Sequence, residues 1–241
     1  MKPSIRNSAA RRPAKSPAAT APVRTPRPAP ERPPGAAPSE APLLIVISAP
    51  SGGGKTTLCN LLLEAEPNLA RAITCTTREP RAGEKNGVDY HFLSAEEFLR
   101  RLHAGNFIEH ATVYGNNYGI LKSELLGKLR QGRDVLLNVD VQGASTIREH
   151  AAAEPELRRA LVTVFLTPPS LAELEARLIR RGTDAAAVVK KRLAVARQEI
   201  SQWKHFDYLL ISGSKQEDLR RMRAILAAEK MRASRSPAPE V

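Results

Sequence analysis

The sequence predicts an α/β protein in which a parallel sheet is flanked by helices. Short apolar, β-branched runs alternate along the chain with longer helix-forming segments, which is the pattern of a parallel sheet covered on both faces. A glycine-rich loop follows the first such run and leads directly into a helix-forming stretch. The length of 241 residues, 42% of them hydrophobic, is enough for one substantial domain with insertions.

The apolar pattern gives the expected elements in order along the chain. Residues 43–48 form an apolar, β-branched run that predicts a buried strand, and a helix is expected at about 55–66. Residues 71–119 contain short strand-like pieces and one helical stretch near 95–103. Further along, we expect a helix at 123–130, strands at 135–139, 161–166 and 208–211, a helical segment over 171–202 that breaks at Gly182, and a closing helix at 216–231.

Residues 1–42 differ in composition from the rest of the chain. They contain 11 of the 19 prolines, much alanine and arginine, and +6 of the net charge of +12. Such a segment cannot bury a core, so we expect a disordered, solvated tail. An organellar transit peptide, which is also Arg-rich and acid-poor, stays open as an alternative, although the prolines would break its amphipathic helix.

The charge, the cysteines and the apolar runs limit the function classes. Half of the net positive charge lies in the N-terminal tail, which has no aromatic residues for base stacking, so nucleic-acid binding is not favoured. The net positive charge of the remaining residues suits an enzyme that binds phosphates. Only two cysteines, Cys59 and Cys75, indicate a reducing compartment and hence the cytoplasm. The longest apolar runs are too short to cross a bilayer, so no membrane association is expected. The sequence leaves the oligomeric state open.

A phosphate-binding loop is expected directly after the first strand. Residues 49–56 match the P-loop pattern GxxxxGK[ST], except that alanine stands at the first glycine position, and their place between a strand and a helix argues against a chance match. Backbone N–H groups of such a loop, with the N-terminus of the following helix, surround phosphate oxygens. The expected ATP-binding residues are Ala49, Pro50, Ser51, Gly52, Gly53, Gly54, Lys55 and Thr56. Lys55 is expected to reach the β- and γ-phosphates, and Thr56 is expected to bind Mg²⁺.

Asp140 directly follows the expected strand at 135–139. Because the carboxyl ends of parallel strands meet at one edge of a sheet, its carboxylate is expected to lie beside the P-loop. At that place it could be a second Mg²⁺ ligand. It could also cap the helix that begins near Val141, and both roles stay open.

A polar stretch between residues 74 and 118 is expected to bind the phosphate acceptor. Arg78 and Arg81 can each form a bidentate pair with a phosphate, and Tyr90 can donate a further hydrogen bond. A solvated basic loop is the alternative, because either arginine alone is typical of a protein surface.

Several motifs follow the P-loop in a fixed order along the chain. They are Thr76-Thr77-Arg78 with Arg81, Glu84, Gly87, Tyr90 and Phe92; Phe107-Ile108-Glu109; Tyr114 to Gly119; Asp140-Val141-Gln142-Gly143; Pro168-Pro169-Ser170; and Arg177 to Thr183 with Lys191-Arg192-Leu193. By these motifs the chain resembles, from Leu43 to about Met231, the guanylate kinase family of P-loop nucleoside monophosphate kinases. The resemblance implies ATP-dependent phosphorylation of GMP, and of dGMP, with Mg²⁺, in purine nucleotide metabolism. It also implies a P-loop kinase core at 43–73 and 121–241, a GMP-binding insertion at about 74–120 and a helical lid at about 177–195.

Positions that match the family's motifs take on its functional roles as expectations. The residues implied for GMP binding are Arg78, Arg81, Tyr90 and Tyr118 at the phosphate, and Thr74 and Glu109 at the guanine base. The residues implied for catalysis are Lys55, Arg177, Arg181 and Arg192, because cations around the transferring group stabilise a loose phosphoryl transition state. Arg177 could instead pair with Glu173, one helical turn earlier.

The chemistry of Glu109 suits guanine recognition. Guanine presents N1–H and N2–H₂ side by side, a carboxylate accepts both hydrogen bonds, and adenine offers no such pair of donors. A surface carboxylate beside His110 is the alternative. The departures from the family's pattern are Ile120 for a Ser or Thr, Asn138 for an acid, Asn117 for a tyrosine, and Ser212-Gly213-Ser214 for an Asn-Asp-Asp-like stretch.

Two other functions remain as alternatives to a guanylate kinase. Guanylate-kinase-like scaffold domains bind peptides and usually lack a working P-loop, whereas Lys55 and Thr56 are present here. A related kinase with a sugar-phosphate acceptor would share the fold, but Thr74, Glu109 and the pattern at 76–92 argue against it.

Overall fold

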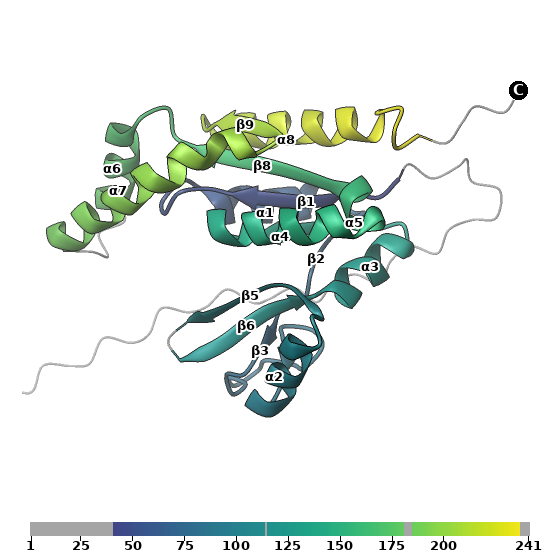
Figure 1. Cartoon of the computed structure of the whole chain (residues 1–241). Helices are drawn as coiled ribbons and strands as arrows, with labels where there is room; N and C mark the ends of the chain where they lie inside the picture. Colours follow the sequence, from purple (N-terminus) through teal and green to yellow (C-terminus); the bar gives the residue numbers. More distant parts are fainter. Residues whose placement is uncertain (1–40, 114, 181–184, 237–241) are drawn as a thin grey trace, which may run out of the picture.

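The computed structural model describes residues 41–113, 115–180 and 185–236, which form two sheets and the helices around them. The larger sheet has five parallel strands in the order β2-β7-β1-β8-β9. Its strands are β1 (Leu44–Ser48), β2 (Leu69–Arg71), β7 (Asp134–Asn138), β8 (Leu161–Thr167) and β9 (Tyr208–Ile211). The central strand β1 pairs with β7 on one side and with β8 on the other. Figure 1 shows β8 beside β1.

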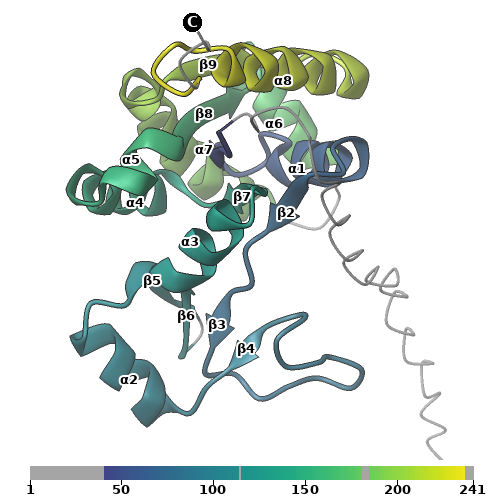
Figure 2. The same cartoon turned by 90° about the vertical axis from the view of Figure 1, so that its right-hand side faces the viewer.

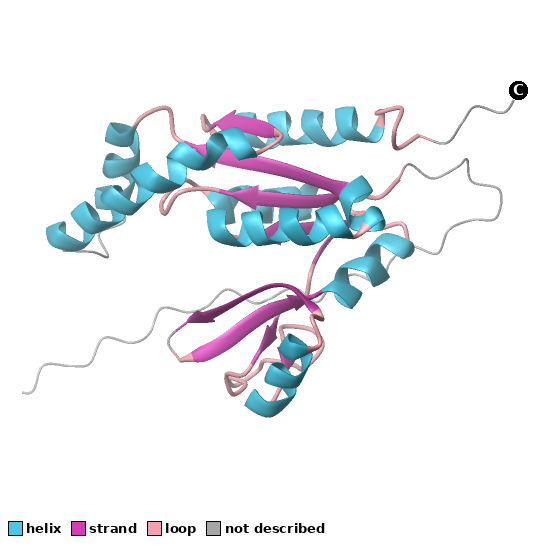
Figure 3. Ribbon diagram, viewed as in Figure 1, coloured by secondary structure: helices cyan, strands magenta, loops and turns pink. Residues whose placement is uncertain are grey.

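Every side chain of β1 is buried, and successive side chains of a strand point to opposite faces of the sheet. Both faces must therefore be covered, and helices cover them. The covering helices are α1 (Lys55–Ala65), α3 (Lys122–Arg130), α4 (Val141–Ala153), α5 (Pro155–Ala160) and α8 (Lys215–Lys230). Ile45 and Ile47 pack in one cluster with α1 and α8, whereas Leu44 and Val46 pack in another with α3, α4 and α5. Figure 3 shows helices above and below these strands. The predicted α/β class with a helix-flanked parallel sheet is confirmed.

The larger sheet gathers four strand ends at one edge. Because β1, β7, β8 and β9 run parallel, their last residues, Ser48, Asn138, Thr167 and Ile211, lie at the same edge. The chain passes from β1 to β2 on one side of the sheet and later to β8 on the other, so β1 borders the point where the strand order reverses. In open α/β sheets ligands bind at the carboxyl ends of the strands at this point.

A smaller sheet is inserted between β2 and β7, with the strand order β4-β3-β6-β5. Its elements are β3 (Cys75–Thr76), β4 (His91–Phe92), α2 (Ala95–His103), β5 (Phe107–Val113) and β6 (Asn116–Leu121). The hydroxyl of Ser94 caps α2 by accepting the N–H of Glu97, and the rings of Phe98 and Phe107 stack with centroids 4.5 Å apart. Figures 1 and 2 show this unit to one side of the larger sheet.

Two helices after β8 form an arm, which is α6 (Leu171–Arg180) and α7 (Ala186–Ser201). They pack on each other through a small cluster of their own, which contains Leu178 and Val189. In Figure 1 the arm projects at the left of the larger sheet. A 3₁₀ helix, η1 (Gln202–His205), then returns the chain to β9.

The predicted elements agree closely with the observed ones, with three differences. Strand β2 was not predicted, because the expected strand-like pieces began only at residue 71. The helical segment expected over 171–202 is two helices, and its expected break at Gly182 falls in residues 181–184, outside the described residues. Helix α5 was not predicted, because an alanine-rich stretch with one proline gives no clear period. Of the expected disordered tail at 1–42, residues 1–40 are also outside the described part. No helix within the described ranges is long and apolar enough to span a bilayer.

Candidate active site

The loop after β1 has the backbone geometry of a phosphate-binding turn. Gly52 and Gly54 have φ values of 91° and 97°, in the left-handed region that favours glycine. A Cβ on Gly52 would lie 2.9 Å from a methyl carbon of Leu178, so the arm packs closely on the loop. Gly54 is the N-cap of α1, so the free N–H groups and the positive dipole end of that helix open on the loop.

A cavity of about 310 Å³ lies within this loop, and we call it the P-loop cavity. It is lined by residues 49–57 together with Asp140 and Glu199. All eight residues predicted to bind ATP therefore line one cavity at the end of β1. A glycine-rich turn, an ammonium group and a helix N-terminus together favour an anionic ligand.

The side chain of Lys55 is held at the carboxyl end of β7. Its Nζ donates a hydrogen bond of 2.6 Å to the carbonyl oxygen of Val139, just beyond β7. Burial lowers the pKa of Lys55, and the nearby carboxylate of Asp140 acts in the opposite direction. The ammonium is therefore partly desolvated, which strengthens its attraction for a phosphate that replaces the carbonyl oxygen.

Asp140 caps a helix and also lines the P-loop cavity. Its Oδ1 accepts the N–H of Gly143 at 2.8 Å, so the predicted role as N-cap of α4 is confirmed. Thr56 lines the same cavity. A hydroxyl and a carboxylate are oxygen donors of the kind that Mg²⁺ prefers, so these two residues fit a magnesium ion.

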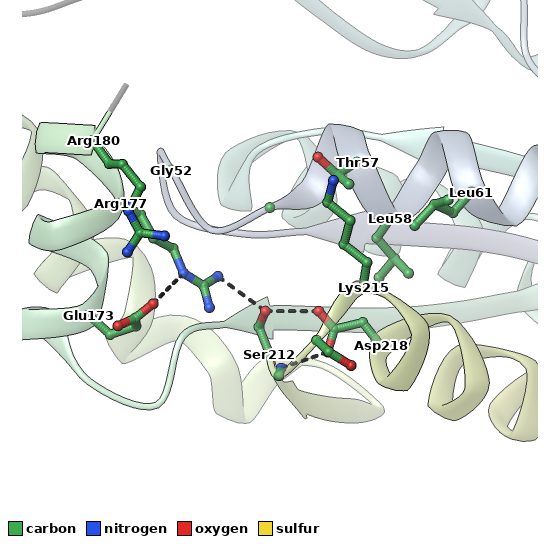
Figure 4. A pocket seen from close by; sticks show the side chains of 13 residues that line it. Gly52, Thr57, Leu58, Leu61, Glu173, Arg177, Arg180, Ser212, Lys215 and Asp218 are labelled. Carbon is green, nitrogen blue, oxygen red and sulfur yellow. Dashed lines mark hydrogen bonds and ion pairs between the residues drawn. The ribbon is translucent and has the colours of Figure 1, made fainter. Parts of the chain in front are cut away.

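A second cavity, of about 510 Å³, lies beside the P-loop between α1, α6 and the start of α8 (Figure 4). Leu58 and Leu61 of α1 line it, and Arg177, Arg180 and Lys215 bring positive charge to it. Such a combination of apolar lining and cations suits a flat ring system attached to an anionic group.

Arg177 is fixed in this second cavity by a chain of polar contacts (Figure 4). Its Nε donates to Glu173 at 2.9 Å, and its terminal NH1 donates to the hydroxyl of Ser212 at 3.1 Å. That hydroxyl donates in turn to the buried carboxylate of Asp218 at 2.8 Å, which also accepts the N–H of Gly213. The expected alternative that Arg177 pairs with Glu173 is therefore confirmed, and the guanidinium is held at the edge of the cavity.

Arg78 and four neighbours, which are Arg81, Glu84, Tyr90 and Tyr118, form a polar cluster in the smaller sheet and its loops. Arg78 donates two hydrogen bonds from NH2 to the carboxylate of Glu84, at 2.9 and 3.0 Å. The Glu84 contact, with a smaller contribution from Tyr118, raises the pKa of Arg78. Its guanidinium lies 5.4 Å from the ring centre of Tyr90, and the rings of Tyr90 and Tyr118 meet edge to face. Arg81 joins the cluster through its backbone N–H, which Glu84 accepts at 2.7 Å.

Glu109 lies where the smaller sheet meets α4. Burial, and then the charge of Asp140, raise the pKa of Glu109 to about 6. A Cβ on Gly143 would lie 3.3 Å from the Cγ of Glu109, and His150 of α4 contacts the carbonyl oxygen of Ile108 at 2.6 Å. A half-buried carboxylate in this position can accept hydrogen bonds from an uncharged donor pair. Thr74 lies on the linker before β3, where its carbonyl oxygen accepts the N–H of His91.

Comparison with known proteins gives the family. The sequence model of the guanylate kinase family matches residues 42–229. The chain belongs to the guanylate kinase family. It is 42% identical to a guanylate kinase of Paramagnetospirillum magneticum over 193 residues, which are 80% of this chain and 87% of the relative. It is 44% identical to a guanylate kinase of Idiomarina loihiensis over 191 residues, which are 78% of this chain and 88% of the relative.

A solved structure supports the same family. The crystal structure of guanylate kinase from Anaplasma phagocytophilum is 35% identical in sequence and superposes with a TM-score of 0.60, covering 82% of this chain and 90% of that one. The predicted resemblance to this enzyme family is confirmed.

Some residues singled out by the guanylate kinase motifs lie away from the two cavities. Arg192 lies on α7 and is not among the residues that line either one. Arg181 lies outside the described residues. Arg180, which was not predicted, lines the second cavity. Glu199 and Asp218 were also missed, because an acid on an amphipathic helix is typical of a solvated surface.

The departures from the guanylate kinase pattern have structural roles of their own. Ile120 is buried and packs in the core cluster below α3 and α4. The backbone N–H of Asn117 donates to the hydroxyl of Thr77, and its side-chain oxygen accepts from Thr112. Ser212 holds Arg177. Asn138 is exposed at the end of β7, at the edge where the cavities lie.

Proposed function

We propose that the chain transfers the terminal phosphate of ATP to GMP, and to dGMP, with Mg²⁺, as an enzyme of purine nucleotide metabolism. One observation carries the proposal. Glu109, the residue expected to contact guanine, lies beside the first turn of α4, where a Cβ on Gly143 would be 3.3 Å from its Cγ. The N–H of the same Gly143 donates to Asp140, which lines the P-loop cavity. This position supports a role for Glu109 in base recognition next to the P-loop.

The P-loop cavity takes the phosphates of ATP, and the second cavity takes its ribose and adenine. Lys55 exchanges the Val139 carbonyl oxygen for phosphate oxygens. Adenine packs along the leucines of α1, near the backbone of 212–214. Thr56 and Asp140 would hold Mg²⁺, which would neutralise negative charge on the bound phosphates.

The polar cluster around Arg78 takes the phosphate of GMP. Arg78 exchanges Glu84 for this phosphate, and Arg81, Tyr90 and Tyr118 add further donors. Glu109 accepts N1–H and N2–H₂ of guanine, and Thr74 contacts the base from the linker before β3.

Phosphoryl transfer in this arrangement needs no general base. The attacking oxygen belongs to the GMP phosphate, which is largely ionised near neutral pH. Lys55, Arg177, Arg181 and Arg192 stabilise the negative charge of the transferring group. Closure of the arm and of the smaller sheet toward the P-loop excludes water.

The same proposal divides the chain into working parts and gives its location. The core is residues 43–73 and 121–241, the GMP-binding insertion is about 74–120, and the lid is about 177–195. We place the protein in the cytoplasm, with ATP and GMP as its small-molecule partners.

The decisive experiment measures ADP formation from ATP and Mg²⁺ with GMP, dGMP, AMP, CMP or UMP added singly. Turnover with the guanine nucleotides far above the others is expected. Absence of turnover with every acceptor, in protein shown to be folded, would contradict the proposal and favour a binding module of the scaffold type.

GMP binding is expected to weaken in acid because Glu109 must be ionised to accept two hydrogen bonds. Since the pKa of Glu109 is raised to about 6, affinity is constant above about pH 7 and falls as the pH drops through 6. GMP affinity is measured without metal from pH 5 to 8 for the native chain and for Glu109→Gln. The ratio of the two affinities cancels the titration of the GMP phosphate, so a ratio that does not vary with pH would contradict this role.

Replacing Ser212 with alanine is expected to loosen Arg177 and to destabilise the fold. The buried carboxylate of Asp218 loses a donor, which costs about 1–2 kcal/mol in the free energy of unfolding. Arg177 keeps only its contact with Glu173, so kcat/KM for ATP falls by about tenfold. Thermal melting and steady-state kinetics check both effects, and Ser212→Thr, which keeps the hydroxyl, is expected to restore them.

A further inference from the structure

A carboxylate from the arm enters the P-loop cavity. Glu199 lies in the last turn of α7, yet it lines this cavity together with the residues of the P-loop. Its Oε2 accepts the backbone N–H of Ser51 at 3.3 Å. A P-loop N–H group is the kind of donor that a phosphate oxygen uses, so an internal anion occupies part of the space for the ligand.

The charges that line the P-loop cavity are unusual for an anion site. They are the carboxylates of Asp140 and Glu199 and the ammonium of Lys55. Burial and the charge of Asp140 raise the pKa of Glu199, while the Ser51 N–H and Lys55 act in the opposite direction. The two carboxylates thus lie close enough to influence each other.

These charges treat two forms of a triphosphate differently. A free triphosphate brings about four negative charges against two carboxylates, and like charges at this range repel strongly in a partly desolvated site. A triphosphate that carries a divalent cation has about half that charge, and the cation itself is attracted by the carboxylates. Asp140 has a structural reason to be present, since it caps α4, whereas α7 needs no acid at position 199 for its own formation.

We propose that Glu199, acting with Asp140, makes the P-loop cavity select the cation-bound form of ATP over the free form. Glu199 is a specificity-determining residue for the state of the nucleotide, and it repels a triphosphate that arrives without its metal. This inference rests on the proposed function, because it takes ATP as the ligand of the P-loop cavity.

The test measures the dissociation constant of ATP twice for each variant, once with excess Mg²⁺ and once with a chelator, at equal ionic strength. The full chain carries a single tryptophan, Trp203, in η1 directly after α7, and its fluorescence reports binding. Glu199→Gln keeps an acceptor oxygen for Ser51 and removes the charge. This variant is expected to lower the dissociation constant of free ATP by about tenfold. The dissociation constant of Mg²⁺-bound ATP is expected to change by less than threefold.

Two controls separate charge from packing. Glu175→Gln removes one charge from the exposed side of α6 and is expected to leave the ratio of the two dissociation constants unchanged. Glu199→Asp keeps the charge and is expected to retain most of the preference for the metal-bound form. The measurement is repeated with inorganic triphosphate, which has no base. Glu199→Gln is expected to change the ratio of the two dissociation constants as it does for ATP, because Glu199 acts on the phosphates in the P-loop cavity.

The outcomes are distinct from those that test the proposed function. If the native chain binds ATP and Glu199→Gln leaves the ratio unchanged, or weakens both forms equally, the inference is overturned and the proposed function stands. If the native chain binds no ATP in either condition, the proposed function fails and the inference falls with it.

Discussion

Replacing Lys55 with alanine is expected to reduce phosphoryl transfer by at least about 10²–10³-fold, the cost of removing one preorganised charge from a transition state. The ammonium is partly desolvated and held at the end of β7, so no other side chain within the described part of the P-loop cavity can supply its positive charge. The fold is expected to survive, because the variant leaves only the carbonyl oxygen of Val139 without this donor, at about 1 kcal/mol. Steady-state turnover and thermal melting are measured together.

Lys204→Ala is the matched control for this prediction, since Lys204 is exposed on η1, lies outside the proposed lid and lines neither cavity. It should keep native turnover. Turnover of Lys55→Ala within threefold of the native chain would contradict the P-loop assignment, whereas a variant that melts early would have to be repeated with Lys55→Met, which preserves the apolar stem.

Replacing Glu109 with glutamine is expected to lower kcat/KM for GMP by about a hundredfold and to narrow the preference over AMP. Two charge-assisted hydrogen bonds from guanine are lost, and the new side-chain amide places a donor against the donors of the base. The variant should fold well, because it preserves volume and removes the repulsion from Asp140 that raises the Glu109 pKa. Initial rates with GMP and with AMP give the selectivity as a ratio.

An exposed acid of the same sheet unit provides the control. Glu96 lies in the first turn of α2 and lines neither cavity. Glu96→Gln removes its charge and is expected to leave the rates with GMP and with AMP unchanged. Unaltered selectivity in Glu109→Gln would assign guanine recognition to another residue of the linker or of β6.

The sequence was sufficient for four of the five strands of the larger sheet and for the loop after β1, because these depend on local patterns, whereas the three-residue edge strand β2 was not predicted. β1 is a continuous buried run, and the loop after it needs glycine at the two positions with positive φ. The residues at the strand ends could likewise be placed together, since parallel strands share an edge. Asp140 was placed beside the P-loop in this way. The sequence left open whether it binds Mg²⁺ or caps a helix, and the structure contains the capping contact to Gly143.

The contacts that join distant segments could not be predicted from local patterns. Glu199 meets Ser51 across 148 positions, and Ser212 meets Arg177 across 35. Neither pair has a periodicity or a spacing that distinguishes it from solvated side chains. Such contacts depend on how α6 and α7 pack against the P-loop, through Leu178 beside Gly52, and packing of this kind is a property of the whole fold.

The groups proposed to bind phosphates already have hydrogen-bond partners within the chain. Lys55 has a carbonyl oxygen, Arg78 has Glu84, Arg177 has Glu173 and the N–H of Ser51 has Glu199. Each substrate contact is therefore an exchange, and its net free energy is smaller than that of a contact made by a group with no partner. We therefore expect low affinity for each substrate and rapid release of each product. When a phosphate departs, the protein oxygen that it displaced accepts the same hydrogen bond again.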